Sequence, residues 1–168
     1  MFNKADFNIR RLPAVILSVL LLLLADRVTK NIALDHLAGR EPFSVIPNVL
    51  LFTYVENRGI AFGMFQGKAA IFVVVAVVVS LFCLYACLKL PKGRHYIPVF
   101  LCLCAITAGA LGNMADRLMY GFVVDFIYFK PIDFPVFNVA DIYITCGAFI
   151  LVFLLIFFYK EDELKFII

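Results

Sequence analysis

Clustered charge of one sign is missing from this chain of 168 residues. Its net charge of +3 is small and spread along the sequence, with no run of like charges and no low-complexity tract. Proteins that bind nucleic acid through its phosphates concentrate lysine and arginine in patches. The sequence therefore predicts no nucleic-acid partner.

Histidine is scarce as well. His36 and His95 are the two in the chain, and no H-E-x-x-H or comparable metal spacing occurs. The cysteines all fall in long apolar segments without a nearby histidine, so we interpret them as small buried apolar residues; they are Cys83, Cys87, Cys102, Cys104 and Cys146. Ser18 and Ser80 lie in the same kind of segment without a neighbouring base. These absences argue against a metal site, a cofactor and a serine or cysteine nucleophile.

Apolar residues, in contrast, are in excess. They make up 64% of the chain, with a mean hydropathy of +1.01, against about 45–50% in ordinary soluble domains. A soluble protein of this size could not bury that much apolar surface, so the bilayer must be its solvent. Four segments provide the roughly 20 apolar residues that a spanning helix needs: 12–33, 69–90, 96–119 and 140–158. We predict one integral membrane domain over residues 1–168.

The first apolar segment resembles a secretory signal, because Arg10 and Arg11 precede it. However, Asp26, Arg27 and Lys30 follow the apolar run, and no small-residue cleavage site stands out. We therefore expect this segment to be a retained membrane anchor.

Lysine and arginine also predict the orientation in the membrane. An even number of spans places both termini on one side, and the basic residues that flank the spans gather on that side: Lys4, Arg10, Arg11, Lys89, Lys92, Arg94, Lys160 and Lys165. The positive-inside rule makes this side cytoplasmic. The loops 34–68 and 120–139 would then face outward.

Two polar clusters mark the outer ends of the first and third spans. In "DRVTK", Asp26 and Lys30 lie four residues apart on one helix face, where they either simply anchor the helix as an ion pair or help to shape a site. In "GNMADR", Asn113, Asp116 and Arg117 share a face. A stripe of small residues continues that face and permits close helix contact: Ala105, Gly109 and Gly112. We expect Asp116 and Arg117 to form a buried ion-pair network that braces this end.

Two further carboxylates lie in or beside the second outer loop. In "FNVAD", Asn138 stands where a helix N-cap belongs, and Asp141 lies near the positive end of the following helix dipole, which favours its ionised form. Asp125 interrupts a short, extended apolar run without an adjacent cation. Ionisable residues at membrane depth are functional candidates. Two carboxylates held together share one proton near neutral pH, so that one activates water while the other protonates or polarises a carbonyl.

Taken together, these motifs resemble the bacterial lipoprotein signal peptidases (signal peptidase II), over nearly the whole chain. Five motifs occur in the family's order: D-x-x-[ST]-K at 26–30, N-x-G-x-A-F at 57–62, G-N-x-x-D-R at 112–117, V-x-D-F at 123–126 and F-N-x-A-D at 137–141. Each motif alone is weak evidence. Five in order, at matching topological positions, are specific.

The resemblance implies a membrane all-α fold of four transmembrane helices with a small extracytoplasmic β-cradle and a short interfacial helix. Strand formers fill 48–55, residues 56–59 can turn, and "IAFGMF" at 60–65 suits the interfacial helix. The family's catalytic aspartates fall on Asp125 and Asp141. Substrate-contacting or site-shaping residues fall on Asp26, Lys30, Asn57, Gly59, Asn113, Asp116, Arg117 and Asn138.

The implied activity is an aspartic endopeptidase that needs no metal or cofactor. Its substrate would be a diacylglyceryl-modified prolipoprotein, cut before the lipidated cysteine. The enzyme would be a monomer of the bacterial cell (inner) membrane, in contact with membrane lipid, and would cut its substrate at the outer membrane surface.

Three other classes fit the sequence less well. A proton- or ion-coupled carrier should hold acids near mid-span, but the middles of the four predicted spans are free of charge. A purely structural scaffold would not require polar clusters that converge on one face. An intramembrane protease of the G-x-G-D type lacks its motif here.

Overall fold

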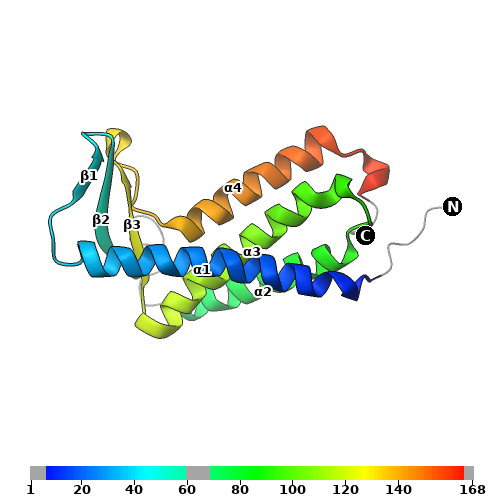
Figure 1. Cartoon of the computed structure of the whole chain (residues 1–168), viewed down its shortest axis with the longest axis horizontal. Helices are drawn as coiled ribbons and strands as arrows, with labels where there is room; N and C mark the ends of the chain where they lie inside the picture. The colour runs from blue at the N-terminus through cyan, green and yellow to red at the C-terminus, as the bar shows by residue number, and fades with distance from the viewer. Residues whose placement is uncertain (1–6, 60–68, 165–168) are drawn as a thin grey trace.

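A computed structural model describes residues 7–59 and 69–164. Four long helices and a small sheet make up most of this part of the chain (Figure 1). The helices are α1 (Leu12–Leu37), α2 (Ala69–Lys89), α3 (Ile97–Tyr120) and α4 (Val139–Phe153), the last extended by a π-helical turn over Leu154–Phe158. The strands are β1 (Phe43–Ile46), β2 (Leu50–Asn57) and β3 (Val123–Phe129). Short 3-10 turns lie at Ile9–Arg11, Arg94–Tyr96, Lys130–Ile132 and Glu161–Glu163.

The four helices confirm the predicted spans. Each is long and apolar enough to cross a membrane, with a mean hydropathy of 1.8 to 3.0. The first is longer than predicted, since α1 continues to Leu37 beyond its apolar run. The helix α3 is the central one, because 61% of its spanning window is buried, against 28% or less in the other three. The chain is a multi-pass membrane protein.

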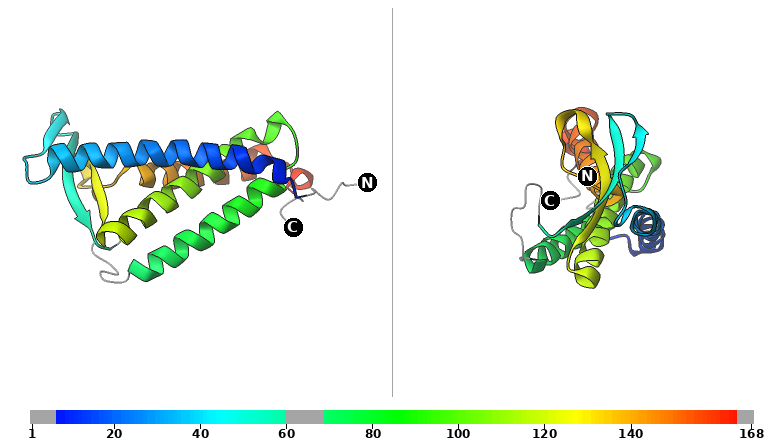
Figure 2. Two further views of the ribbon diagram at one scale, coloured as in Figure 1. Left: turned by 60° about the horizontal axis from the view of Figure 1, so that its bottom comes forward. Right: turned by 90° about the vertical axis from the view of Figure 1, so that its left-hand side faces the viewer.

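The sheet lies across one end of the helices, and the first and last described turns, Ile9–Arg11 and Glu161–Glu163, lie at the other end (Figure 1). We call these the sheet end and the terminal end. The helix α2 diverges from α1 toward the sheet end (Figure 2, left). Contact between α2 and α3 is extensive, whereas α1 barely touches α2.

The sheet is antiparallel, in the order β1-β2-β3. Val124 and Phe126 on β3 pack with Ala33 of α1 in a small apolar core. Because side chains alternate along a strand, Asp125 between them points to the opposite face. It is paired with Val55 of β2 in the ladder. The expected extended run around Asp125 is therefore confirmed.

The first outer loop fits its predicted pattern in part. The expected strand at 48–55 is present as β2, but β2 begins at Leu50 and continues through Asn57. Glu56 and Asn57, which we expected in a turn, therefore belong to the strand, because both pair with β3. The expected interfacial helix at 60–65 lies outside the described residues.

Small residues let α3 approach its neighbours closely, as their spacing predicts. A Cβ atom on Gly109 would lie 2.4 Å from the backbone oxygen of Ala140 on α4. A Cβ on Gly112 would lie 2.6 Å from Oδ2 of Asp26 on α1. Neither contact leaves room for a methyl group. The polar ends of α1, α3 and α4 meet because of these glycines.

Candidate active site

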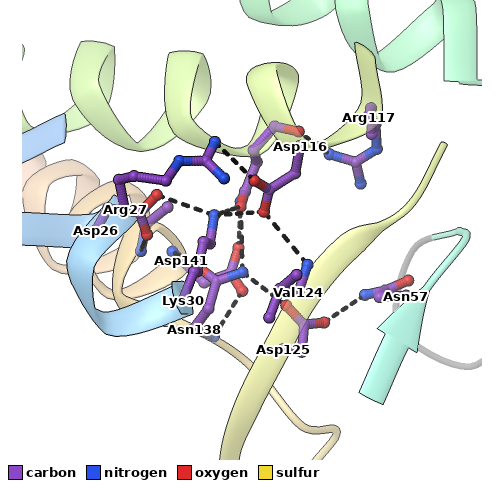
Figure 3. Close-up of polar contacts among 12 residues, drawn as sticks. Asp26, Arg27, Lys30, Asn57, Asp116, Arg117, Val124, Asp125, Asn138 and Asp141 are labelled. Carbon is purple, nitrogen blue, oxygen red and sulfur yellow. Dashed lines mark hydrogen bonds and ion pairs between the residues drawn. The ribbon is translucent and has the colours of Figure 1, made fainter. Parts of the chain in front are cut away.

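Lys30 lies at the centre of a buried polar network at the sheet end (Figure 3). Its side chain is 1% exposed. The ammonium lies 2.9 Å from Oδ2 of Asp26, 2.9 Å from Oδ2 of Asp116, and 3.0 Å from Oδ1 of Asn113. A lysine ammonium has three hydrogens to donate and no acceptor. These three oxygens can take all three, so the ion pair expected from the i,i+4 spacing is confirmed within a larger network.

Asp116 is fully buried, and its partners come from two other elements, α1 and β3. Besides Lys30, the backbone N–H of Val124 donates to its Oδ2 at 3.3 Å. A guanidinium nitrogen of Arg27 lies 3.0 Å from Oδ1, although outside hydrogen-bonding geometry. Asp116 thus joins α1, α3 and β3.

The expected buried ion-pair network is confirmed around Asp116, but among the described residues Arg117 does not belong to it. In the described part of the chain no ion pair joins them, because Asp116 points toward α1 while its neighbour points toward α2. Arg27 supplies the second cation instead. The i,i+3,i+4 spacing predicted a shared helix face, but it could not indicate which neighbouring helix each residue meets.

Asp26 links α1 to the start of α4. Its Oδ2 is paired with Lys30, and its Oδ1 accepts a hydrogen bond from the backbone N–H of Ala140 at 3.0 Å. The first N–H groups of a helix have no partner within the helix. A carboxylate from another helix therefore caps α4, and so fixes the first turn that carries Asp141.

Asn138 caps α4 as its sequence position predicts. Its Oδ1 accepts from the backbone N–H of Asp141 at 3.0 Å, and the Asp141 carboxylate accepts from the backbone N–H of Asn138 at 3.1 Å. Asn138 also does more than cap the helix. Its amide NH2 donates to Oδ1 of Asp125 at 2.6 Å and to Oδ1 of Asn113 at 3.1 Å.

These amides join the two candidate catalytic carboxylates. Asn113 donates its NH2 to Oδ1 of Asp141 at 2.7 Å. Asn57 donates to Oδ2 of Asp125 at 2.8 Å, and the backbone N–H of Gly59 donates to Oδ1 of Asn57 at 3.0 Å. Asp125 and Asp141 come from β3 and α4, and the network holds them at one place.

Asp125 differs from an ordinary surface aspartate in its protonation. Burial, and after it the negative charge of Asp141, raise its pKa to about 7, although hydrogen bonds from Asn57 and Asn138 and the charge of Lys30 oppose the shift. Near neutral pH, Asp125 therefore keeps a proton in a substantial fraction of molecules. A protonated and an ionised carboxyl group side by side can act as acid and base toward one water molecule.

Arg117 lies at the edge of this network. Its guanidinium donates to the backbone oxygens of Asn113 and Gly59, both at 3.3 Å, and lies 4.5 Å from the ring centroid of Phe72 on α2. The motif predicted Asn57, Gly59 and Arg117 at the site. It gave no signal for Phe72, which lies in a uniformly apolar helix.

A cavity of about 1000 Å³ opens beside Asp141; Asp125 does not line it, but its hydrogen-bond partner Asn57 does. Asn57, Asn113, Arg117 and Asp141 line its polar part. The apolar part is formed by α2, α3, α4 and the segment after β3, and includes Phe72, Val75, Val79, Ile106, Phe134 and Ile142. Such a cavity suits a ligand with a long apolar portion and a polar group at one end.

The cysteines fit their expected buried role with one exception. Cys83, Cys87, Cys102 and Cys104 are buried, whereas Cys146 on α4 is exposed and lines the cavity. Within residues 7–59 and 69–164, no group of three or more histidine, cysteine or carboxylate side chains is placed to hold a metal ion.

The structure thus brings all ten predicted site residues to the sheet end. The residues that the sequence analysis did not assign to the site are Arg27, Phe72 and the backbone N–H groups of Val124 and Ala140. Arg27 was visible beside Asp26, but its partner was not. Backbone donors carry no side-chain signal at all.

Comparisons with known proteins identify relatives over most of the chain. A family model described as signal peptidase (SPase) II matches residues 18–157. The lipoprotein signal peptidase of Caldanaerobacter subterraneus subsp. tengcongensis is 47% identical over 133 residues, which is 79% of this chain and 88% of that protein. That of Clostridium novyi is 35% identical over 151 residues, 88% of this chain and 99% of that protein. A solved structure described as a bacterial membrane enzyme, obtained by the in meso method at 2.3 Å resolution, matches with a TM-score of 0.77 and 30% identity over 98% of this chain and 99% of that one. The chain belongs to the signal peptidase II family.

Proposed function

We propose that Asp125 and Asp141 are the catalytic pair of a membrane aspartic endopeptidase that removes the signal peptide from prolipoproteins. The observation that carries this proposal is the joining of the two carboxylates, through Asn113 and Asn138, at the polar end of an apolar cavity. Membership of the signal peptidase II family supports the same reaction.

In the proposed reaction, Asp125 holds the proton and Asp141 is ionised. Asp141 takes a proton from water as the water oxygen attacks the scissile carbonyl, and Asp125 gives its proton to the carbonyl oxygen. The tetrahedral intermediate then collapses: Asp125 takes a proton back from one of its two hydroxyl groups as the carbonyl re-forms. The C–N bond breaks, and the proton on Asp141 passes to the leaving amine.

The substrate in this proposal is a precursor whose cysteine already carries diacylglycerol, and the cut falls before that cysteine. The apolar walls of the cavity would take the apolar parts of the precursor, because each buried methylene contributes about 0.8 kcal/mol. Two acyl chains in the bilayer would also hold the cysteine at a fixed depth, which lowers the entropic cost of reaching the carboxylates.

We further propose that the sheet end faces outward and the terminal end faces the cytoplasm, since basic residues flank the spans at the terminal end. The site would then meet its substrate at the outer membrane surface. The protein would act as a monomer, because one chain supplies both carboxylates and the cavity.

The test is an in vitro cleavage assay with one precursor before and after diacylglyceryl transfer, in the same detergent or liposomes. We expect cleavage of the lipidated form alone, and mass spectrometry should place the cut directly before the modified cysteine. Equal cleavage of both forms would contradict the lipid requirement. No cleavage of either form by the folded protein would contradict the proposed function.

A further inference from the structure

Lys30 makes one contact that a purely structural ion pair would not need. Besides two carboxylates, its ammonium donates to the neutral side chain of Asn113 at 3.0 Å. An ammonium can only donate hydrogen bonds, so the Asn113 atom that faces it must be the amide oxygen. The NH2 group of the same amide must then point away from Lys30, and it lies 2.7 Å from Oδ1 of Asp141.

The same reasoning fixes the other two amides. The backbone N–H of Asp141 donates to Asn138, so the NH2 of Asn138 faces Asp125 and the oxygen of Asn113. The backbone N–H of Gly59 orients Asn57 in the same way. Two of the three amides are thus oriented by backbone donors. Asn113 is the exception, because a side-chain cation orients it together with the NH2 of Asn138.

We propose that Lys30 is a positioning residue for the reaction: it fixes the amide of Asn113 so that a hydrogen-bond donor is held against Asp141. This inference rests on the proposed role of Asp125 and Asp141. If Asn113 turned over, its oxygen would face a carboxylate oxygen of Asp141, and two acceptors would meet without a hydrogen between them. The energetic cost of that contact falls on the ionised form of Asp141, which is the form that accepts the proton from water.

The charge of Lys30 also reaches Asp125. Charged groups on the elements packed around Asp125 are Asp26, Arg27 and Lys30 on α1, Glu56 on β2 with Arg58 after it, Asp116 and Arg117 on α3, and Asp141 on α4. Lys30 lowers the pKa of Asp125, against burial and the charge of Asp141. Removing the ammonium should therefore keep the proton on Asp125 to a higher pH.

The test measures kcat and KM against pH for Lys30→Met with the lipidated precursor. We expect kcat to fall about 100-fold, the cost of a slightly misplaced reacting group, while KM changes little because Lys30 does not line the cavity. The alkaline limb of the kcat profile, where kcat falls because Asp125 loses its proton, should move to higher pH. Lys30→Arg, whose guanidinium also only donates, should return that limb to the wild-type pH even where its larger side chain lowers the rate.

Arg27→Gln is the matched control, because Arg27 lies on the same helix and contacts the same Asp116 but does not touch Asn113. We expect its alkaline limb to stay at the wild-type pH. If the limb of Lys30→Met also stays in place, Lys30 is only a structural tie and the inference is overturned. It is equally overturned if Arg27→Gln moves the limb as far as Lys30→Met does.

Lys30→Met leaves two buried carboxylates without their shared cation, so its folding is checked by size-exclusion chromatography. Should it not fold, the charge-balanced double variant Lys30→Met with Asp116→Asn takes its place. The same loss of kcat at constant KM is expected, since the donor to Asn113 is still missing. A wild-type rate in the folded double variant would overturn the inference. The proposed function is judged separately, on cleavage by the wild-type protein.

Discussion

The two ends of the helix bundle both join helices through polar contacts, but they do so at very different depths. At the sheet end, the side chains of Lys30 and Asp116 are 1% and 0% exposed. At the terminal end, Nε2 of His95 lies 3.1 Å from a carboxylate oxygen of Glu163, with side chains 43% and 35% exposed. A buried charge must find its partners within the protein, whereas an exposed one also has water.

The terminal end uses its polar groups to close the bundle. Arg11 donates to the backbone oxygens of Cys87, Leu90 and Pro91, and so caps the end of α2. The hydroxyl of Tyr159 donates to the backbone oxygen of His95 at 2.6 Å. Its ring stacks on that of Tyr96, with the ring centroids 5.5 Å apart. These contacts satisfy backbone oxygens where the helices end.

The sheet end uses its polar groups to support a site. The network that begins at Lys30 continues through Asn113 and Asn138, and it ends on Asp125 and Asp141 beside the cavity. In this protein, the buried charges that are paired inside the molecule lie at the candidate active site. The exposed pair of His95 and Glu163 lies at the terminal end, where polar contacts only join the helices.

The largest expected effect is a loss of activity from substitutions at the sheet end, with no such loss at the terminal end. Asp125→Asn and Asp141→Asn should each lower kcat about 1000-fold or more, because each removes a proton-transfer role, while both variants insert and fold. Glu163→Gln at the terminal end is the control and should cleave at the wild-type rate. Full activity in either aspartate variant would remove the proposed mechanism.

The second comparison concerns stability. Asp116→Ala leaves Lys30 and Arg27 short of a buried partner, so we expect a loss of about 3–5 kcal/mol in the free energy of unfolding and lower activity. Glu163→Ala should cost less than about 1 kcal/mol. Arg117→Ala should lower activity and, less strongly, stability, since it removes two long hydrogen bonds and the contact with Phe72. Thermal melts in detergent measure all three, and equal losses for Asp116 and Glu163 would contradict the comparison.

The third test uses pH. The folded protein holds the proton on Asp125 up to about pH 7, whereas the unfolded chain releases it near 3.8. Between these values the folded state binds more protons, so this group's contribution to stability is present at low pH and is lost as pH rises through the window. The loss amounts to about 4 kcal/mol. Thermal melts from pH 4 to 8 should show the wild type losing stability relative to Asp125→Asn as the pH rises. A difference in melting temperature that stays constant with pH would contradict the raised pKa of Asp125.

A smaller effect is expected from two glycines in the interface between α3 and α4, Gly109 nearer to the sheet end and Gly147 nearer to the terminal end. Gly109→Ala places a methyl group 2.4 Å from a backbone oxygen of α4, which cannot move alone, so we expect a loss of about 1–3 kcal/mol and reduced activity. Gly147→Ala, on the same interface, would meet a side-chain atom of Ile106 at 3.0 Å and the backbone oxygen of Cys102 at 3.2 Å, so its nearest backbone contact is 0.8 Å longer than that at Gly109. Its stability should change less. The reverse order in thermal melts would contradict this account.

The smallest effect is expected at the terminal end. Tyr159→Phe removes the hydrogen bond to the backbone oxygen of His95 and should cost about 1 kcal/mol without changing the cleavage rate. A lower rate in this variant, measured with the lipidated precursor, would show that the two ends are coupled.

The sequence by itself determined the four spans and the strand that carries Asp125, and it indicated the ten candidate site residues that the structure brings together. Spans are predictable because a bilayer demands about 20 consecutive apolar residues. Asn138 as the N-cap and the pair of Asp26 with Lys30 followed from local spacing along a helix. The motifs identified the site residues because their order matches a known family.

Only the tertiary structure decided which of these residues meet. It paired Asp116 with Arg27 and Lys30 rather than with Arg117, extended β2 through Asn57, and brought the ring of Phe72 under Arg117. It also supplied backbone donors from Val124 and Ala140 to buried carboxylates. The physical reason is that these contacts depend on how far the helices approach and rotate. Close approach at Gly109 and Gly112 sets that geometry, and spacing within a single helix does not carry it.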